Sequence, residues 1–155
     1  MTYVRLQKGF ISLTAIMDWY SRYVLDWEVS VTMDTEFCCA TLSRVLTQSV
    51  PEIFNTDQGS QYTAKPFLDL LKAHPIRISM DGRGRALDNV FVERLWRSVK
   101  QEEVYLHDYQ TVSEAKEGLS AYFRWVNQEC LHQSLEYKTP ESVYTGQATL
   151  AQEAS

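Results

Sequence analysis

Three strand-like patterns fill the first thirty residues of the chain, with only short breaks between them. Residues 2–6, 10–18 and 23–30 are rich in Val, Ile, Leu and Trp, and the two breaks are residues 7–9 and 19–22. Breaks of this length fit hairpin turns and are too short for the crossover that parallel neighbours require. The opening segment therefore predicts an antiparallel meander of three strands.

Helical and short strand patterns alternate after this meander. Apolar residues recur at helical spacing in several segments, and Pro66 falls in the first turn of one of them, where its missing N–H costs little. Asp88 is suited to cap the helix that contains Glu93. The predicted elements are helices over residues 35–49, 64–73 and 112–131, a helix beginning near Asp88, short strands over 52–56 and 76–80, and a basic loop over 81–85.

This order of elements predicts one α/β domain, with a mixed sheet of three antiparallel strands and short parallel strands flanked by helices. We expect the domain to occupy residues 1–144, and the small polar residues of 145–155 to form a frayed tail. The length of 155 residues suffices for a sizeable core. The hydrophobic fraction of 45% is typical of soluble globular proteins.

Several classes of protein are disfavoured by the composition. Apolar runs all fall short of the roughly 20 residues of a membrane span, and the start of the chain has no leader pattern. Cys38, Cys39 and Cys130 are an odd number without the spacing of a zinc site or a disulfide framework. We therefore expect a cytoplasmic protein that does not contact a membrane.

The formal net charge of −5 disfavours DNA as a partner, because phosphate contacts rely on Lys and Arg. The charges are segregated along the chain, however, and acidic residues concentrate after residue 100. A local basic stretch can bind phosphate despite the net charge, although a solvated basic helix face is the alternative. Six cations lie within residues 77–100: Arg77, Arg83, Arg85, Arg94, Arg97 and Lys100.

Two carboxylates stand out by their surroundings. Asp57 follows a short apolar strand and precedes a Gly-Ser pair, which fits either a simple turn or a ligand at a strand end. Glu93 lies on a predicted helix, opposite the apolar stripe and four residues before Arg97. On spacing alone Glu93 and Arg97 would form an exposed ion pair. Two carboxylates beside amide and basic groups also fit a hard divalent cation with a phosphate substrate.

Four segments in the same order carry a resemblance to a known family. They are residues 17–22 (MDWYSR), 56–62 (TDQGSQY), 88–93 (DNVFVE) and 131–140 (LHQSLEYKTP), and 35 residues separate Asp57 from Glu93. In these segments the chain resembles the catalytic core of bacterial insertion-sequence transposases, in the superfamily of retroviral integrases. The resemblance implies a ribonuclease H-like fold and an Asp-Asp-Glu triad whose last two members are Asp57 and Glu93.

The resemblance further implies how the chain would act. Asp57 and Glu93 would hold Mg²⁺ or Mn²⁺ for cleavage and strand transfer of DNA. The implied partners are element ends, target DNA and further copies of the chain or a full-length transposase. His132 matches a family position, but we interpret it as a local hydrogen-bonding group. The residues expected to contact DNA are Arg83, Arg85, Asn89, Arg97 and Lys100.

One family residue falls outside the sequence. The first Asp of the triad would stand directly before Met1, so we expect a truncated core that is weak or inactive alone. Asp18 ends the second predicted strand near that position. It is interpreted as a structural residue that fixes the strand end, or as a substitute metal ligand. Two alternatives therefore remain: a nuclease using Asp18, Asp57 and Glu93, and a non-catalytic DNA- or transposase-binding inhibitor.

Overall fold

The computed structural model describes residues 1–32, 34–56, 60–80, 90–132 and 135–153, and for Met80, Val90 and residues 147–153 it describes the backbone alone. Its first strands form an antiparallel sheet in the order β1 (Thr2–Leu6), β2 (Gly9–Met17) and β3 (Val24–Ser30). Gly9 closes the first hairpin with a φ of 112°, a conformation that residues with a Cβ rarely adopt. The predicted meander is confirmed.

A parallel pair of strands follows. β4 (Ile53–Thr56) and β5 (Arg77–Met80) pair in register, and the crossover between them contains α2 (Ser60–Thr63) and α3 (Lys65–Lys72). The predicted α/β class with both strand directions is confirmed. A short helix, α2, begins at Ser60, the second residue of the Gly-Ser pair for which the sequence predicted a turn.

The strands do not form one continuous sheet within the described residues. β1 pairs with β2 only as far as Leu13, opposite Thr2, so no described strand lies on that side of residues 14–17. β4 and β5 form a separate hydrogen-bonded sheet. The predicted antiparallel and parallel strands are therefore both present, and among the described residues they form two separate hydrogen-bonded sheets.

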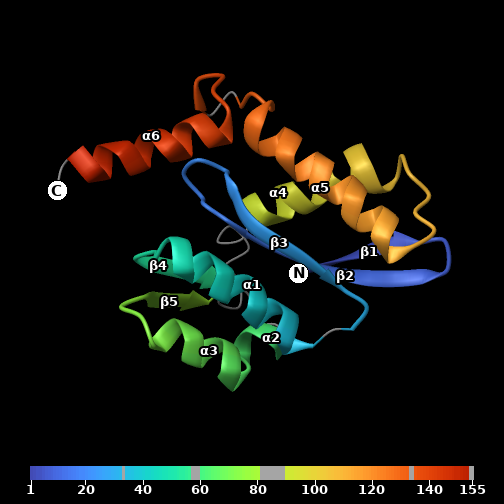
Figure 1. The fold of residues 1–155 in the computed structure, drawn as a ribbon, viewed down its shortest axis with the longest axis horizontal. Helices are drawn as coiled ribbons and strands as arrows, with labels where there is room; N and C mark the ends of the chain where they lie inside the picture. Colours follow the sequence, from blue (N-terminus) through green and yellow to red (C-terminus); the bar gives the residue numbers. More distant parts are fainter. Residues whose placement is uncertain (33, 57–59, 81–89, 133–134, 154–155) are drawn as a thin grey trace.

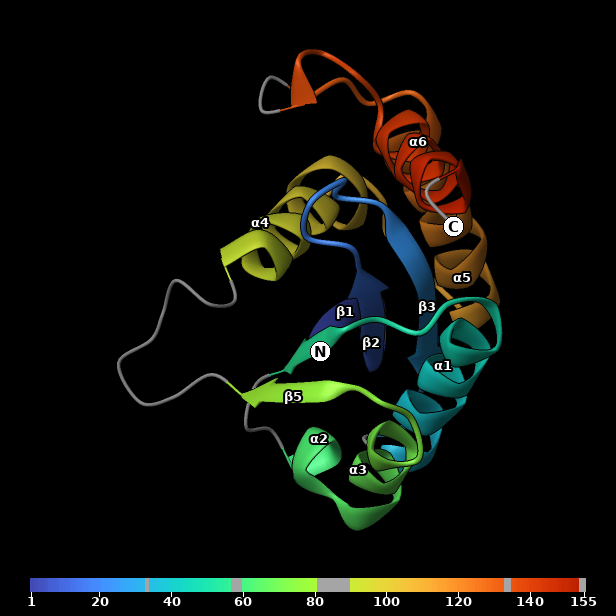
Figure 2. The ribbon, with the colours of Figure 1, turned by 90° about the vertical axis from the view of Figure 1, so that its left-hand side faces the viewer.

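Strand alternation divides the core between the two faces of the antiparallel sheet. Ile11 and Leu13 are buried against α4 (Val90–Val99) and α5 (Val112–Gln128). Ile16, on the opposite face, packs against the cluster formed by α1 (Thr35–Gln48), α3 and the parallel strands. In Figure 2, α4 and α1 lie on different sides of the antiparallel strands, and α5 lies beside β3. The apolar burial of both faces fixes the position of α4, which carries Glu93.

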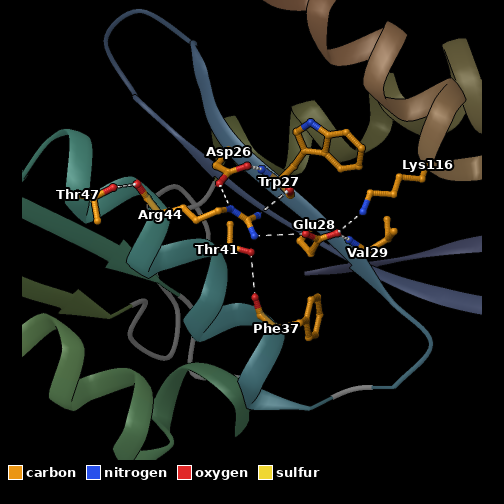
Figure 3. A network of polar contacts seen from close by, with 9 residues as sticks. All are labelled: Asp26, Trp27, Glu28, Val29, Phe37, Thr41, Arg44, Thr47 and Lys116. Carbon is orange, nitrogen blue, oxygen red and sulfur yellow. Dashed lines mark hydrogen bonds and ion pairs between the residues drawn. The ribbon is translucent and has the colours of Figure 1, made fainter.

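A polar network fastens β3 to the neighbouring helices (Figure 3). Arg44 of α1 donates from Nε to Asp26 Oδ2 at 2.6 Å, and its Nη1 lies 3.3 Å from Glu28 Oε2. Lys116 of α5 reaches the other oxygen of Glu28 at 3.3 Å. The hydrogen bond with Asp26 raises the pKa of Arg44. Because these groups are partly exposed, their ion pairs add little to the stability of the fold. Their main effect is to fix the positions of α1 and α5 on β3.

Two further elements belong to the last part of the chain. α4 runs directly into a π-helical turn, η2 (Lys100–Val104), and α6 (Pro140–Glu153) extends into the segment predicted as a tail from residue 145. Thr139 Oγ1 accepts a hydrogen bond from the Ser142 amide at 3.3 Å, and the Ala, Gln and Glu residues that follow are good helix formers. α6 extends from the end of α5 along the outside of the molecule (Figure 1). None of the described helices is long and apolar enough to cross a membrane.

Gly118 of α5 gives a test of this packing. A Cβ at Gly118 would lie 2.6 Å from Glu103 Oε1 and 2.7 Å from the Tyr109 hydroxyl. We expect Gly118→Ala to lower the free energy of unfolding by about 1–2 kcal/mol, because it displaces this hydrogen-bonded pair. Gly146 of α6 is the matched control, since a Cβ there meets nothing within 4 Å. Gly146→Ala should raise stability by about 0.5–1 kcal/mol. Urea denaturation measures both, and equal stability of the two variants would contradict this packing.

Candidate active site

The predicted site residues divide into two groups. Asp57, Arg83, Arg85 and Asn89 lie outside the described residues. The described group contains Glu93, Arg97 and Lys100 on α4 and its continuation, and Asp18 at the end of β2. The site can therefore be built from the described group and from the residues that lead into Asp57.

A small cavity joins the segments that lead to the two predicted metal ligands. Its volume is about 50 Å³, and its lining includes Asn55 and Thr56 at the end of β4, Val92 of α4, Met1 and Thr14. Thr56 immediately precedes Asp57 in the sequence, and Val92 immediately precedes Glu93. The fold thus brings β4 and α4, which are distant in sequence, to one place together with the first residue of the chain.

Asn55 contributes an oxygen without a partner to this region. Its Nδ2 donates to Ser79 Oγ at 3.2 Å, whereas its Oδ1 is buried and accepts no hydrogen bond from the residues that the structure describes. Asn55 lines both the small cavity and a neighbouring one of about 340 Å³, which Asp18 and Val92 also line. A buried amide oxygen without a donor is unusual in proteins and leaves an open coordination or hydrogen-bonding position.

The helix α4 presents Glu93 to solvent. Leu95 and Val99 are buried in the core on its opposite face, with exposures of 8% and 0%. Glu93 and Arg97 are both exposed, and within the described part of the chain no ion pair of 4.0 Å or less joins them. The exposed pair that spacing alone favours is therefore not formed. The carboxylate of Glu93 has no described hydrogen-bonding partner.

Arg97 and Lys100 are separated from the acidic residues that follow them. The π-helical turn directs Glu102 toward α5, where its Oε2 accepts a hydrogen bond from the Tyr122 hydroxyl at 2.6 Å. Glu103 accepts a hydrogen bond from the Tyr109 hydroxyl. Burial and these carboxylates raise the pKa of both tyrosines, which stay protonated donors. The acids are thus occupied on the α5 side, and Arg97 and Lys100 lack such neutralising partners among the described residues.

Asp18 holds the turn between β2 and β3. Its Oδ2 accepts hydrogen bonds from the Ser21 amide at 3.0 Å and the Ser21 hydroxyl at 2.6 Å. The Asp18 carbonyl accepts from the Arg22 amide at 2.8 Å, and Arg22 has a φ of 64°. The Asp18 carboxylate therefore satisfies the polar groups of a turn in which one residue is left-handed.

Most of the polar side-chain atoms around the small cavity are oxygens, and Cys38 adds a thiol whose pKa is raised by burial. Asn55 Oδ1 is available, and the neighbouring carboxylates in sequence are those of Asp57 and Glu93. Oxygen ligands of this kind suit Mg²⁺ or Mn²⁺ and disfavour zinc. Within the described ranges, which exclude Asp57, no three His, Cys, Asp or Glu side chains gather as a metal centre would require. The residues present fit a hard divalent cation, provided that Asp57 joins them.

Three features of this site were missed by sequence reasoning. These features all depend on contacts between distant segments. They are the unpartnered oxygen of Asn55, the π-helical turn that contains Glu102, and the position of Met1 in the cavity lining. Only Asn55 had a sequence signal, because it belongs to a short run of polar residues around Asp57.

Comparison with family models identifies both parts of the chain. Residues 1–86 match a model described as integrase core domain, and residues 74–140 match a second model with the same description. Together these matches cover β1 through the start of α6.

Curated relatives of the chain are bacterial proteins. The chain is 28% identical over 145 residues to the transposase for insertion sequence element IS904 of Lactococcus lactis subsp. lactis (strain IL1403), a match that covers 91% of this chain and 57% of the relative. It is 33% identical over 108 residues to transposase InsF for insertion sequence IS3A of Escherichia coli (strain K12), covering 68% of this chain and 38% of the relative. The chain thus spans about half the length of these relatives, or less.

Solved structures with a similar fold come from viruses. The catalytic core domain of BIV integrase superposes with a TM-score of 0.74 at 18% identity, covering 98% of this chain and 95% of that one. The HTLV-2 integrase catalytic core domain in complex with magnesium gives 0.67 at 20% identity, covering 90% and 88%. At this identity the likeness establishes the fold, which is that of integrase catalytic cores and hence ribonuclease H-like.

Proposed function

Because the chain belongs to the integrase core domain family, we propose that it is the catalytic core of an insertion-sequence transposase, acting in DNA cleavage and strand transfer. The observation that carries this proposal is the cavity shared by Thr56 and Val92, the residues next to Asp57 and Glu93. It supports a site in which these two carboxylates face the same phosphodiester. The transposases named above support the choice of DNA as substrate.

In this proposal Asp57 and Glu93 hold the metal, and Asn55, which lines the same cavity as Val92, would support them through its Oδ1. When bound, Mg²⁺ or Mn²⁺ supplies an activated nucleophile and stabilises the leaving oxygen of an in-line displacement. Glu93 suits its role because it is exposed and unpaired, while Leu95 and Val99 anchor its helix in the core. Asp18 acts through the β2–β3 turn, because both hydrogen bonds to its Oδ2 come from Ser21.

The phosphate backbone would lie along the exposed face of α4. Arg97 is one helical turn beyond Glu93, and Lys100 follows on the same side. Neither cation has an ion-pair partner in the described ranges, which leaves both charges available for phosphate. Arg83, Arg85 and Asn89, in the segment before α4, would extend this contact. Joining two DNA ends would require a further copy of the chain or a full-length transposase.

DNA binding can be tested with the cations of α4. We expect Arg97→Gln and Lys100→Gln each to weaken binding to duplex DNA uniformly across sequences and to reduce the salt dependence of log K by about 0.9. Lys116→Gln is the matched control, because Lys116 faces Glu28 on another side of the molecule. Fluorescence anisotropy over a series of salt concentrations measures the slope. A slope that changes equally in all three variants would contradict a DNA contact at α4.

Binding without cleavage would favour the second candidate, an inhibitor that occupies DNA or pairs with a transposase. Its distinguishing result is dominant inhibition of transposition by the chain, retained in Glu93→Gln. If Glu93→Gln relieves the inhibition, the catalytic proposal is favoured instead.

A further inference from the structure

A third cavity lies between α4 and α5, apart from the two that Asn55 lines. Its volume is about 200 Å³, and the β2–β3 turn and the segment after α5 close its ends. Much of its wall is apolar: Leu95 from α4, and Trp125 and Val126 from α5, line it together with Met17. Ligand pockets commonly start at about 300 Å³, so this cavity has room for a small ligand, about one ring in size.

Two guanidinium groups also line this cavity. Arg22 lies over the ring of Phe91, with its Cζ 3.5 Å from the ring centroid, and Phe91 itself lines the cavity. Arg94 lies one turn along α4 from Phe91 and is exposed. Burial and the neighbouring charge of Arg94 lower the pKa of Arg22. The side chains of Arg22 and Arg94 make no hydrogen bond or ion pair within 4.0 Å to another described residue.

His132 adds a nitrogen that lacks a partner. Its Nε2 is buried and forms no hydrogen bond with any described residue, and its ring lines the cavity. Burial and the charge of Arg22 lower the pKa of His132, which favours the neutral imidazole. A buried polar nitrogen without a partner is costly, and a ligand atom at this position would remove that cost.

The charge of the wall indicates the charge of the ligand. Arg22 and Arg94 are cationic, and Glu102 is the carboxylate in the lining. Glu102 is already engaged by the hydroxyl of Tyr122. With His132 neutral, the residues that line the cavity carry one net positive charge, which a single negative charge on a ligand would balance. Asp18, whose charge also acts on Arg22, lies outside the lining and is engaged by Ser21. A bare inorganic anion would leave the apolar wall in contact with water, whereas an aromatic ring would fill it.

We propose that the cavity between α4 and α5 binds a small monoanion with one aromatic ring, its acidic group held by Arg22 and Arg94 and its ring between Leu95, Trp125 and Val126. The nitrogen of His132 would take the remaining polar contact. This site goes beyond the proposed function and does not rest on it, since Glu93 is not among the described residues that line the cavity.

The probes are benzoate and its neutral isostere benzamide, titrated into the full chain without DNA or metal. Amide ¹H–¹⁵N NMR spectra report the site, and we expect shifts at Phe91, Ser98, Val126 and Cys130 with benzoate. Benzamide should bind at least about tenfold more weakly, because it lacks the charge. Arg94→Gln should weaken benzoate binding by about tenfold, and Arg22→Gln by a similar factor. Arg124→Gln, an exposed position of α5 outside the lining, should leave it unchanged.

The spectra of the variants also show whether each variant keeps its fold. Arg22→Gln removes the contact between Arg22 and Phe91, and if this disturbs the β2–β3 turn, the result for Arg94→Gln decides the test. Equal binding of benzoate and benzamide, shifts confined to residues away from the cavity lining, or an equal effect of Arg124→Gln would overturn the proposal. Inorganic phosphate is the last probe. If it binds as tightly as benzoate at the same residues, the cavity is a phosphate contact and the aromatic ligand is ruled out.

Discussion

A chain carrying one additional aspartate directly before Met1 will nick supercoiled plasmid DNA faster than the unextended chain, by on the order of 100-fold in Mn²⁺. The register of the sheet supplies the reason. Thr2 pairs with Leu13, so a residue before Met1 that continues β1 would pair with Ala15. Ala15 packs against the core that contains Leu95 of α4. A carboxylate there would face the helix that carries Glu93.

The control for this prediction is an asparagine at the same added position, which has the same shape without the charge. The extended chain with Glu93→Gln is the second control, and it should lose the gained activity. Plasmid nicking is followed by gel electrophoresis at several protein concentrations. Equal rates for the aspartate and asparagine extensions would show that the added carboxylate takes no part in the reaction.

Asp57→Asn and Glu93→Gln will each lower the affinity for Mn²⁺ by at least about 100-fold, measured by isothermal titration calorimetry. Each substitution removes a charge from an oxygen-ligand site and leaves a side chain of nearly the same size, so folding is little affected. Asp18→Asn should retain most of the affinity, because the Asp18 carboxylate is engaged with Ser21. If Asp18→Asn instead abolishes binding together with the other two, Asp18 is a ligand and the nuclease alternative gains support.

Glu117→Gln controls for weak binding at acidic surfaces. Glu117 lines an open acidic groove on α5 with Glu103 and Glu114, on a part of the surface unrelated to Glu93. A loss of Mn²⁺ affinity in this variant, with Glu93→Gln unaffected, would place the metal in that groove and contradict the proposed site.

The parts of the fold that depend on local pattern were predictable from the sequence. The short breaks at residues 7–9 and 19–22 dictated hairpins, and the helical spacing of Leu95 and Val99 placed them in the core with Glu93 on the exposed face. Pro66 marked the start of α3, where it occupies the first turn. In each case the deciding interactions lie within a few residues of one another.

Features that depend on distant contacts were not predictable in this way. The π-helical turn is accompanied by hydrogen bonds from Tyr109 and Tyr122 to Glu103 and Glu102, and the latter pair is 20 residues apart. The separation of the described strands into two hydrogen-bonded sheets is likewise not indicated by any local pattern in β4 or β5. The same holds for the candidate site, because nothing local to Thr56 or Val92 indicates that they line one cavity.

The central claim is that the segments of Asp57 and Glu93 converge on one divalent cation. Paramagnetic Mn²⁺ broadens the NMR signals of nuclei near it, so a titration of the ¹⁵N-labelled chain at low Mn²⁺ locates the ion directly. We expect the amide signals of Asn55, Thr56, Val92 and Glu93 to broaden first and together, and this broadening to vanish in Glu93→Gln. Broadening that is confined to one of the two segments, or that begins around Glu103 and Glu117, would contradict the claim.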